Sequence, residues 1–233
     1  MASTMTVVLG ALMAMGAAGC TRQRTEEVTP ACTGDTARLR GVVVDEKTSA
    51  PLPGALLAVE AVEASGGASG GASYRYGMQA DADGRFDGVF PCGTVNVHAF
   101  ASGHRCGEAS TEVGDVVRVL APALSDQDVA PTLSNASLQP SEVAPGEPVT
   151  VHVTATAGSR VDPLPSDGVV AIAPELAKSF ALDAPALPQG SLGGEWTGSF
   201  AAPSAPGTYA VQLVAASQLC VPSAPTVLTL TVH

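Results

Sequence analysis

Short runs of alternating hydrophobic and polar residues recur from residue 37 to the end of the chain, with turn residues between them. Successive side chains of a β-strand point to opposite faces, so each run predicts a half-buried strand. Residues 37–45, for example, place Leu39 and Val43 on one face and Arg38 and Arg40 on the other. Comparable runs occupy residues 55–62, 74–80, 85–90, 94–101, part of 112–120, 149–153, 169–173, 180–182, 195–200, 208–215 and 226–232. The pattern predicts an all-β protein.

The runs fall into two groups, separated by a segment rich in Asp, Pro and Ser in which we assign residues 124–130 as a linker. We therefore predict two β-sandwich domains in tandem, at residues 32–123 and 131–233. A chain of 233 residues is long enough for two domains that each bury a core. The doubled Gly-Gly-Ala-Ser sequence within residues 64–73 predicts a loop tip rather than a binding motif.

The N-terminus reads as a targeting segment. Residues 7–18 form an apolar run of the length of a signal-peptide core, too short to span a bilayer as a helix. The run ends in Ala-Ala-Gly directly before Cys20, which resembles the lipobox of bacterial lipoproteins. The resemblance implies that residues 1–19 are a signal peptide and that Cys20 becomes the lipidated N-terminus. Residues 20–31 are then a flexible tether.

Lipidation would decide where the protein resides. An acyl chain such as palmitate contributes about 0.8 kcal/mol per buried CH₂, and stable attachment takes more than one chain. A diacylated Cys20 meets that condition, so we expect a lipid-anchored protein of the cell envelope, facing the periplasm or the cell surface. By resemblance, Thr21 after the lipid-bearing cysteine is compatible with sorting to the outer membrane. The alternative is cleavage by the ordinary signal peptidase, because residues 1–6 contain no Lys or Arg.

Four cysteines remain beyond Cys20, and an even number in an exported chain favours disulfides. Cys92 and Cys106 lie at opposite ends of a strand of about 20 Å, whereas bridged Cα atoms lie within about 7 Å, so this pair is the least expected. Cys220 is the single cysteine of the second domain, so full pairing requires a bridge between the domains. Of the three possible pairings we favour Cys32–Cys106 with Cys92–Cys220.

Two metal sites are alternatives to this interpretation. His104 lies near Cys106, as in some zinc sites, but the sequence has no Cys-x-x-Cys pair. Asp81, Asp83 and Asp87 could supply calcium ligands, but the spacing of an EF-hand loop is not met. Turn chemistry accounts for Asp83 followed by glycine without a metal. We therefore predict no metal and no cofactor.

Charge and motifs narrow the function further. Acidic residues outnumber basic ones 22 to 11, for a net charge of −11, so a polyanion is repelled and nucleic-acid binding is not expected. The histidines are His98, His104, His152 and His233, and none stands in a recognisable catalytic motif. A nucleophile requires a base within hydrogen-bond reach, and no sequence pattern marks such a pair. We predict no catalytic residues and no enzymatic activity.

Five segments of the first domain resemble the carboxypeptidase regulatory-like family. They are residues 39–45, 51–55, 81–86, 91–94 and 101–104. The resemblance implies a transthyretin-like sandwich of about seven strands, which in this family mostly serves as an accessory, non-catalytic module.

Three segments of the second domain resemble bacterial immunoglobulin-like domains: residues 146–149, 194–200 and 206–211. The resemblance implies that Tyr209 turns its hydroxyl back to the main chain at a corner of the sandwich. It also places the Cys220 loop at the end nearest the first domain, where a bridge between domains is possible. Trp196 is then expected in the core rather than as a platform for a sugar.

The sequence thus predicts a non-catalytic envelope lipoprotein with a structural or protein-interaction role, and an envelope protein or glycan as its partner. The alternative is an accessory lipoprotein that binds carbohydrate or peptide on a face of the first domain near Tyr74, Tyr76, Phe100 and His104. Exposed aromatic rings gathered on one face would favour the alternative, and buried rings the structural role.

Overall fold

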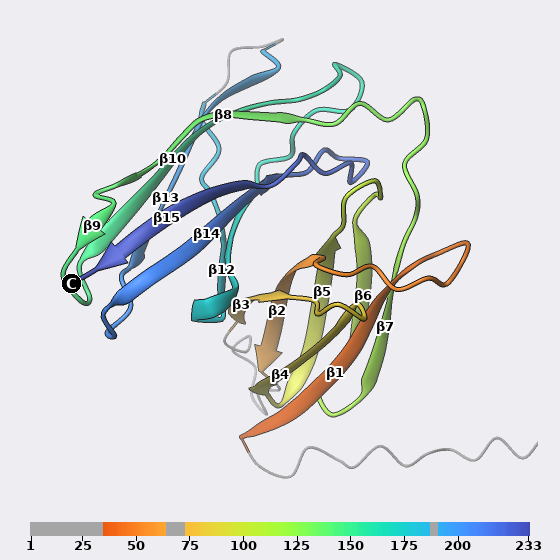
Figure 1. Cartoon of the computed structure of the whole chain (residues 1–233). Coiled ribbons are helices and arrows are strands. Elements are labelled where there is room, and N and C mark those ends of the chain that lie inside the picture. The colour runs from red at the N-terminus through yellow and green to blue at the C-terminus, as the bar shows by residue number, and fades with distance from the viewer. Residues whose placement is uncertain (1–34, 64–72, 187–190) are drawn as a thin grey trace, which may run out of the picture.

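The protein is an all-β molecule of two sandwiches in tandem, as predicted from the sequence. The computed structural model describes residues 35–63, 73–186 and 191–233, and the strands within these ranges form four sheets (Figure 1). The predicted signal peptide, Cys20, the tether, Cys32 and most of the Gly-Ser loop lie outside the described residues.

The first sandwich packs a three-stranded sheet against a four-stranded one. The three-stranded sheet has the order β4-β1-β7, formed by β1 (Thr36–Asp45), β4 (Arg85–Pro91) and β7 (Val116–Ala121). The four-stranded sheet has the order β3-β2-β5-β6, formed by β2 (Leu56–Glu63), β3 (Ser73–Gln79), β5 (Gly93–Phe100) and β6 (Gly107–Glu112). β1 pairs with β4 antiparallel and with β7 parallel.

The core of the first sandwich is the hydrophobic half of each alternating run. Leu39, Val43 and Val97 have no exposed surface, and β2 and β5 contribute alternate residues to the same core. The turn between β3 and β4 depends on Asp81, whose carboxylate accepts hydrogen bonds from the main-chain N–H groups of Asp83 and Arg85, each at 2.8 Å. This carboxylate is therefore already used by the turn.

The second sandwich has sheets of three and five strands. The first has the order β13-β10-β8, formed by β8 (Thr132–Gln139), β10 (Pro148–Thr156) and β13 (Gly193–Ala201). The second has the order β12-β11-β14-β15-β9, formed by β9 (Glu142–Val143), β11 (Val169–Ala173), β12 (Lys178–Ala181), β14 (Gly207–Ala215) and β15 (Thr226–Val232). A single 3₁₀ turn, η1 (Pro174–Leu176), connects β11 to β12 in this part of the chain.

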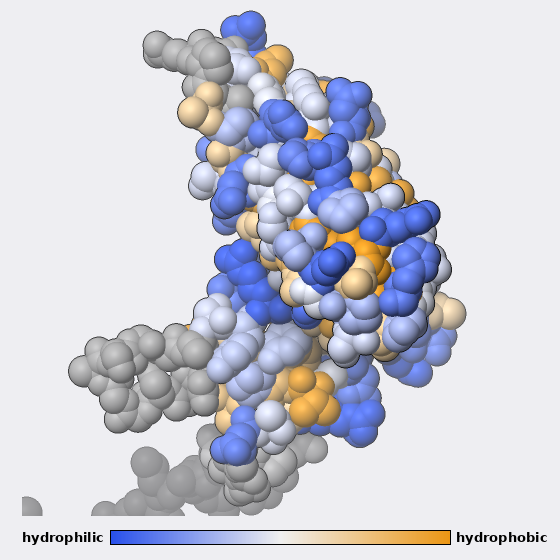
Figure 2. Space-filling model, turned by 90° about the vertical axis from the view of Figure 1, so that its left-hand side faces the viewer, coloured by the Kyte–Doolittle hydropathy of each residue, from blue (hydrophilic) through white to orange (hydrophobic). Residues whose placement is uncertain are grey.

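Two expectations drawn from the immunoglobulin resemblance are confirmed. Trp196 is 1% exposed and lies in the core of the second sandwich. The Tyr209 hydroxyl donates to the main-chain oxygen of Ala205 at 2.8 Å, four residues earlier, and so closes the corner before β14. Figure 2 shows a largely hydrophilic face of the molecule, with one hydrophobic patch on the upper body and a smaller one on the lower body.

Three strands were missed in the sequence, namely β6, β8 and the two-residue β9. β6 reads Gly-Glu-Ala-Ser-Thr-Glu and β8 reads Thr-Leu-Ser-Asn-Ala-Ser-Leu-Gln, and most side chains of both are at least partly exposed. Each lies at the edge of its sheet and contributes few large side chains to a core. An edge strand of this composition is held mainly by ladder hydrogen bonds to one neighbour, which leave no hydrophobic signature in the sequence.

We expect Tyr209→Phe to lower the free energy of unfolding of the second sandwich by about 1 kcal/mol, because it removes one hydrogen bond and keeps the ring. Urea unfolding followed by Trp196 fluorescence measures this. Tyr74→Phe, at a tyrosine that is 43% exposed, is the matched control. Equal effects of the two substitutions would show that the corner hydrogen bond does not stabilise the domain.

Candidate functional site

The two sandwiches meet through the outer faces of their larger sheets. Leu56 and Phe100 of the first sandwich pack with Ile172 and Val214 of the second in an apolar cluster that also contains Cys106. Ile172 and Val214 are 0% and 1% exposed, although they point away from the core of their own domain. This cluster is therefore a third core, which belongs to the junction.

At one side of the cluster the main chains of β3 and β12 come into close contact (Figure 1). The Ser179 hydroxyl donates to the carbonyl oxygen of Tyr76 at 2.8 Å. A Cβ atom at Gly77 would lie 2.0 Å from the carbonyl oxygen of Lys178, so only glycine allows this approach.

A disulfide between Cys106 and Cys220 joins the two domains, with Cα atoms 5.2 Å apart. The N–H of Cys106 also donates to the carbonyl oxygen of Cys220 at 2.8 Å. The predicted bridge between domains is thus present, but the predicted pairs Cys32–Cys106 and Cys92–Cys220 are wrong. Cys92 precedes β5 and Cys106 follows it, so the two cysteines lie at opposite ends of this strand. Cys220 lies at the Cys106 end, and the length of β5 separates it from Cys92. Cys92 is itself disulfide-bonded.

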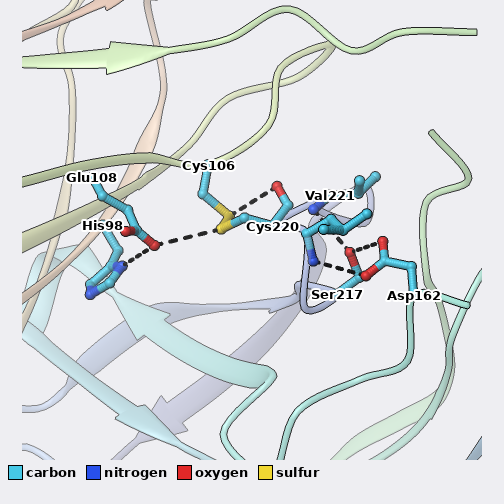
Figure 3. Close-up of a disulfide and its surroundings, with 8 residues drawn as sticks. His98, Cys106, Glu108, Asp162, Ser217, Cys220 and Val221 are labelled. Atoms are coloured by element: carbon cyan, nitrogen blue, oxygen red, sulfur yellow. Dashed lines mark hydrogen bonds and ion pairs between the residues drawn. A yellow bond between two sulfur atoms is a disulfide. The ribbon is translucent and has the colours of Figure 1, made fainter. Parts of the chain in front are cut away.

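A buried carboxylate fixes the loop that carries Cys220 (Figure 3). Asp162 accepts hydrogen bonds from the Ser217 hydroxyl and from the main-chain N–H of Leu219, the latter at 2.8 Å. The Ser217 hydroxyl oxygen in turn accepts the N–H of Val221 at 3.1 Å. These bonds hold Cys220 at φ 59°, a left-handed conformation that a residue other than glycine adopts only with support from its surroundings.

The linker between the domains is also held in place. Arg105 makes two hydrogen bonds to the Asp128 carboxylate, at 2.6 and 3.1 Å, and Asp128 also accepts the N–H of Ser125 at 2.8 Å. These contacts, Arg105 first, lower the pKa of Asp128 to about 2. The carboxylate is therefore ionised at neutral pH and keeps the linker against the β5–β6 loop.

A cleft of about 360 Å³ opens beside the junction, with walls from both domains. Its apolar lining, which we call the floor, is formed by Ala58, Val170 and Ala216, next to the buried ring of Phe100. Its titratable lining residues, which we call the rim, are Glu60, Arg75, His98, Glu108 and Asp167. Arg75 lies 3.7 Å from Glu60, and His98 Nδ1 lies 3.5 Å from Glu108, close to the disulfide (Figure 3).

The four predicted binding residues do not share one exposed face. Tyr74 is 43% exposed, but Tyr76 packs edge-on against Phe90 inside the first sandwich, with ring centroids 4.9 Å apart. Phe100 is 9% exposed and belongs to the junction cluster. His104 lies elsewhere, in the loop after β5. The structure therefore brings only Phe100 to the cleft.

His104 is held by two oxygen atoms. Its Nε2 lies 3.0 Å from the Asp45 carboxylate and its Nδ1 lies 2.9 Å from the carbonyl oxygen of Ser102. The other Asp45 oxygen accepts hydrogen bonds from the hydroxyl and N–H of Thr48. Thr48, with a smaller effect from His104, lowers the pKa of Asp45 to about 2. The pair fastens the turn after β1 to the loop after β5.

The other histidines also pair with carboxylates: His98 with Glu108, His152 with Glu195 and His233 with Glu142. Among the described residues, the hydrogen bonds of the histidines do not include one to a serine, threonine or cysteine side chain, as nucleophilic catalysis requires. In the same part of the chain, no group of three or more His, Cys, Asp or Glu side chains could hold a metal ion. The described ranges contain no helix long and apolar enough to cross a membrane.

The sequence contains a pattern that could have indicated the junction residues, although it is not the alternation by which strands were predicted. Residues 56–59, 169–173 and 213–216 are continuous apolar runs rather than alternating ones. A strand reads this way when both of its faces are buried. The junction supplies the second buried face, so these runs could have indicated Leu56, Ile172 and Val214.

Comparisons with known proteins find only distant structural similarities. No protein-family model matches the chain, and no curated protein matches it. A DUF3823 family protein from Parabacteroides merdae is 10% identical over 85% of this chain and 100% of its own, with a TM-score of 0.33. BcpA, the major pilin subunit of Bacillus cereus, is 8% identical over 84% of this chain and 69% of its own, with a TM-score of 0.30. 3-Chlorocatechol 1,2-dioxygenase from Rhodococcus opacus is 15% identical over 40% of this chain and 61% of its own, with a TM-score of 0.32. This chain therefore spans less than two thirds of the length of that enzyme.

We expect the double variant Cys106→Ser, Cys220→Ser to loosen the junction while both sandwiches stay folded, because each keeps its own core. Loss of the cross-link should lower the free energy of local opening by about 2 kcal/mol or more. Hydrogen exchange should then accelerate in residues 178–181 and 216–221, with the core strands β1 and β10 as internal controls. Unchanged exchange in these segments would mean that the apolar cluster alone holds the junction.

The Arg105–Asp128 pair should stabilise the protein in a pH-dependent way. The folded-state pKa of about 2 is below the value of about 3.9 in an unfolded chain. The stabilisation is therefore present above about pH 4 and is lost as the pH falls toward 2. We expect the difference in urea midpoint between the wild type and Asp128→Asn to shrink between pH 5 and pH 2.5. Asp126→Asn, at an exposed neighbour, is the control, and a pH-independent difference would contradict the assignment.

Proposed function

We propose that the chain is a non-catalytic lipoprotein of the cell envelope, which serves as a rigid structural and protein-interaction module. The junction is the observation that carries the proposal. An apolar cluster, a disulfide and a fixed linker hold the two sandwiches together as one unit. The domains of one chain usually move relative to each other unless their interface is large or cross-linked. The restricted motion of these two domains therefore favours a role in bearing mechanical force or in holding a binding surface in a fixed position.

The side chains of the described residues support a structural role over catalysis or glycan binding. The histidines are held by carboxylates rather than paired with nucleophiles. Trp196 and Phe100 are buried, and Tyr76 packs on Phe90, so these rings are not available as stacking platforms for sugars. The first sandwich is proposed to be of the carboxypeptidase regulatory-like type, and Tyr209 supports an immunoglobulin-like second one.

The direction of the chain supports an anchored arrangement. The carbonyl oxygen of Asp35 accepts the N–H of Cys92, so β1 starts at the end of the first sandwich opposite the loop that carries Cys106. A tether of residues 20–31 reaches at most about 40 Å from a lipid on Cys20. The first sandwich would then lie nearest the membrane and the second would be held away from it.

Cys20→Ser tests the anchor. We expect the wild type, expressed with its leader in a bacterium, to incorporate labelled palmitate and to enter the detergent phase of a Triton X-114 extract. The variant should lack the label and stay in the aqueous phase, because it has no thiol for diacylglycerol. Thr21→Ser is a control that keeps the cysteine. An unlabelled wild type that partitions like the variant would refute lipid anchoring.

Cross-linking tests the interaction role. Lysine-reactive cross-linking of intact envelopes, read by mass spectrometry, is expected to join this chain to another envelope protein. Links confined to the chain itself would leave the lipoprotein assignment standing but would oppose a role in protein interaction.

A further inference from the structure

The cleft beside the junction has the form of a preorganised binding site. Its volume of about 360 Å³ lies within the range of ligand pockets, and such pockets occur preferentially at domain interfaces. One wall belongs to β2, β3, β5 and β6, and the other to β11, β12 and two loops of the second sandwich. Because the disulfide from Cys106 to Cys220 fixes the two walls relative to each other, little ordering is needed when a ligand enters.

The charged residues of the rim favour a ligand that carries positive charge. Three carboxylates line the cleft, on Glu60, Glu108 and Asp167, against the single guanidinium of Arg75. Arg75 is paired with Glu60 at 3.7 Å, so Glu108, which lies 3.5 Å from His98 Nδ1, and Asp167 supply the remaining carboxylates. Asp167 is exposed and has no ion-pair partner among the described residues. The net charge of −11 adds attraction for a cationic partner.

The apolar floor of the cleft favours a cation that is carried on a long apolar side chain. Ala58, Val170 and Ala216 are partly exposed and offer apolar surface beneath the charged rim. Long basic side chains place an apolar stem on such a surface and keep the charged end in water. The two aromatic residues of the lining are unsuited to stacking a sugar, because Phe100 is buried and Phe180 packs on Phe200, with ring centroids 5.5 Å apart.

We propose that this cleft binds a basic, extended segment of a partner protein, with a Lys or Arg side chain laid on the apolar floor and its cation near Glu108 and Asp167. This inference rests on the proposed interaction function and specifies its site. It assigns the cleft, rather than an exposed aromatic face of the first sandwich, as the recognition surface.

The test is a fluorescence anisotropy titration of the folded, oxidised protein with a labelled Lys-Val-Lys-Val-Lys peptide and with its Glu-Val-Glu-Val-Glu counterpart. We expect the lysine peptide alone to bind, more weakly as NaCl rises from about 50 mM to about 300 mM. The double variant Glu108→Gln, Asp167→Asn should weaken binding about tenfold. The double variant Glu46→Gln, Asp126→Asn makes the same change in net charge at exposed positions outside the cleft and should bind as the wild type does. Equal binding of the two peptides, or equal losses in the two variants, would overturn the proposal.

A second measurement separates this proposal from the interaction function itself. A photo-crosslinking amino acid is placed at Gln218, which lines the cleft, or at Val116, which is 81% exposed on the three-stranded sheet of the first sandwich. Capture from position 218 in intact envelopes supports the cleft if the cross-linked partner segment is rich in Lys or Arg, and a segment without basic residues would overturn the proposal. Capture from position 116 alone would overturn the cleft and keep the interaction function, whereas capture from neither position would count against both.

Discussion

The burial of apolar side chains on the outer faces of two facing sheets is the interaction on which this architecture depends. Burial stabilises by about 25 cal/mol per Å² of apolar surface, so Leu56, Phe100, Ile172 and Val214 would be unfavourable on separate, solvated domains. Their contact orients the sandwiches and brings Cys106 within reach of Cys220. The cleft exists because the contact covers only part of the two faces, and the rest forms its walls.

Polar groups at the junction act mainly on geometry. Asp162 shapes the loop around Cys220, Asp45 receives His104, and Asp128 holds the linker through Arg105. Each carboxylate accepts hydrogen bonds from more than one donor, and a buried or half-buried carboxylate requires such partners. Three short loops are thereby fixed relative to one another without a large increase in the hydrophobic core.

The alternation of Leu39, Val43 and their counterparts was enough to predict the fold class and most strands, because one buried face per strand leaves a period of two. The same rule missed β6 and β8, whose small and polar side chains carry no such period. The junction was harder to predict, because disulfide partners depend on which ends of strands face each other in space. The immunoglobulin resemblance placed Cys220 near the first domain but did not identify Cys106, rather than Cys92, as its partner.

The position of the junction disulfide has a consequence for biogenesis. Its two cysteines are 114 residues apart, so during synthesis Cys106 is made well before Cys220. Until the second sandwich is made, Cys106 lacks its final partner. Burial of Cys106, which is 7% exposed in the finished molecule, is completed by the incoming domain. Closure of this bond therefore marks a chain whose two halves have both been made and brought together.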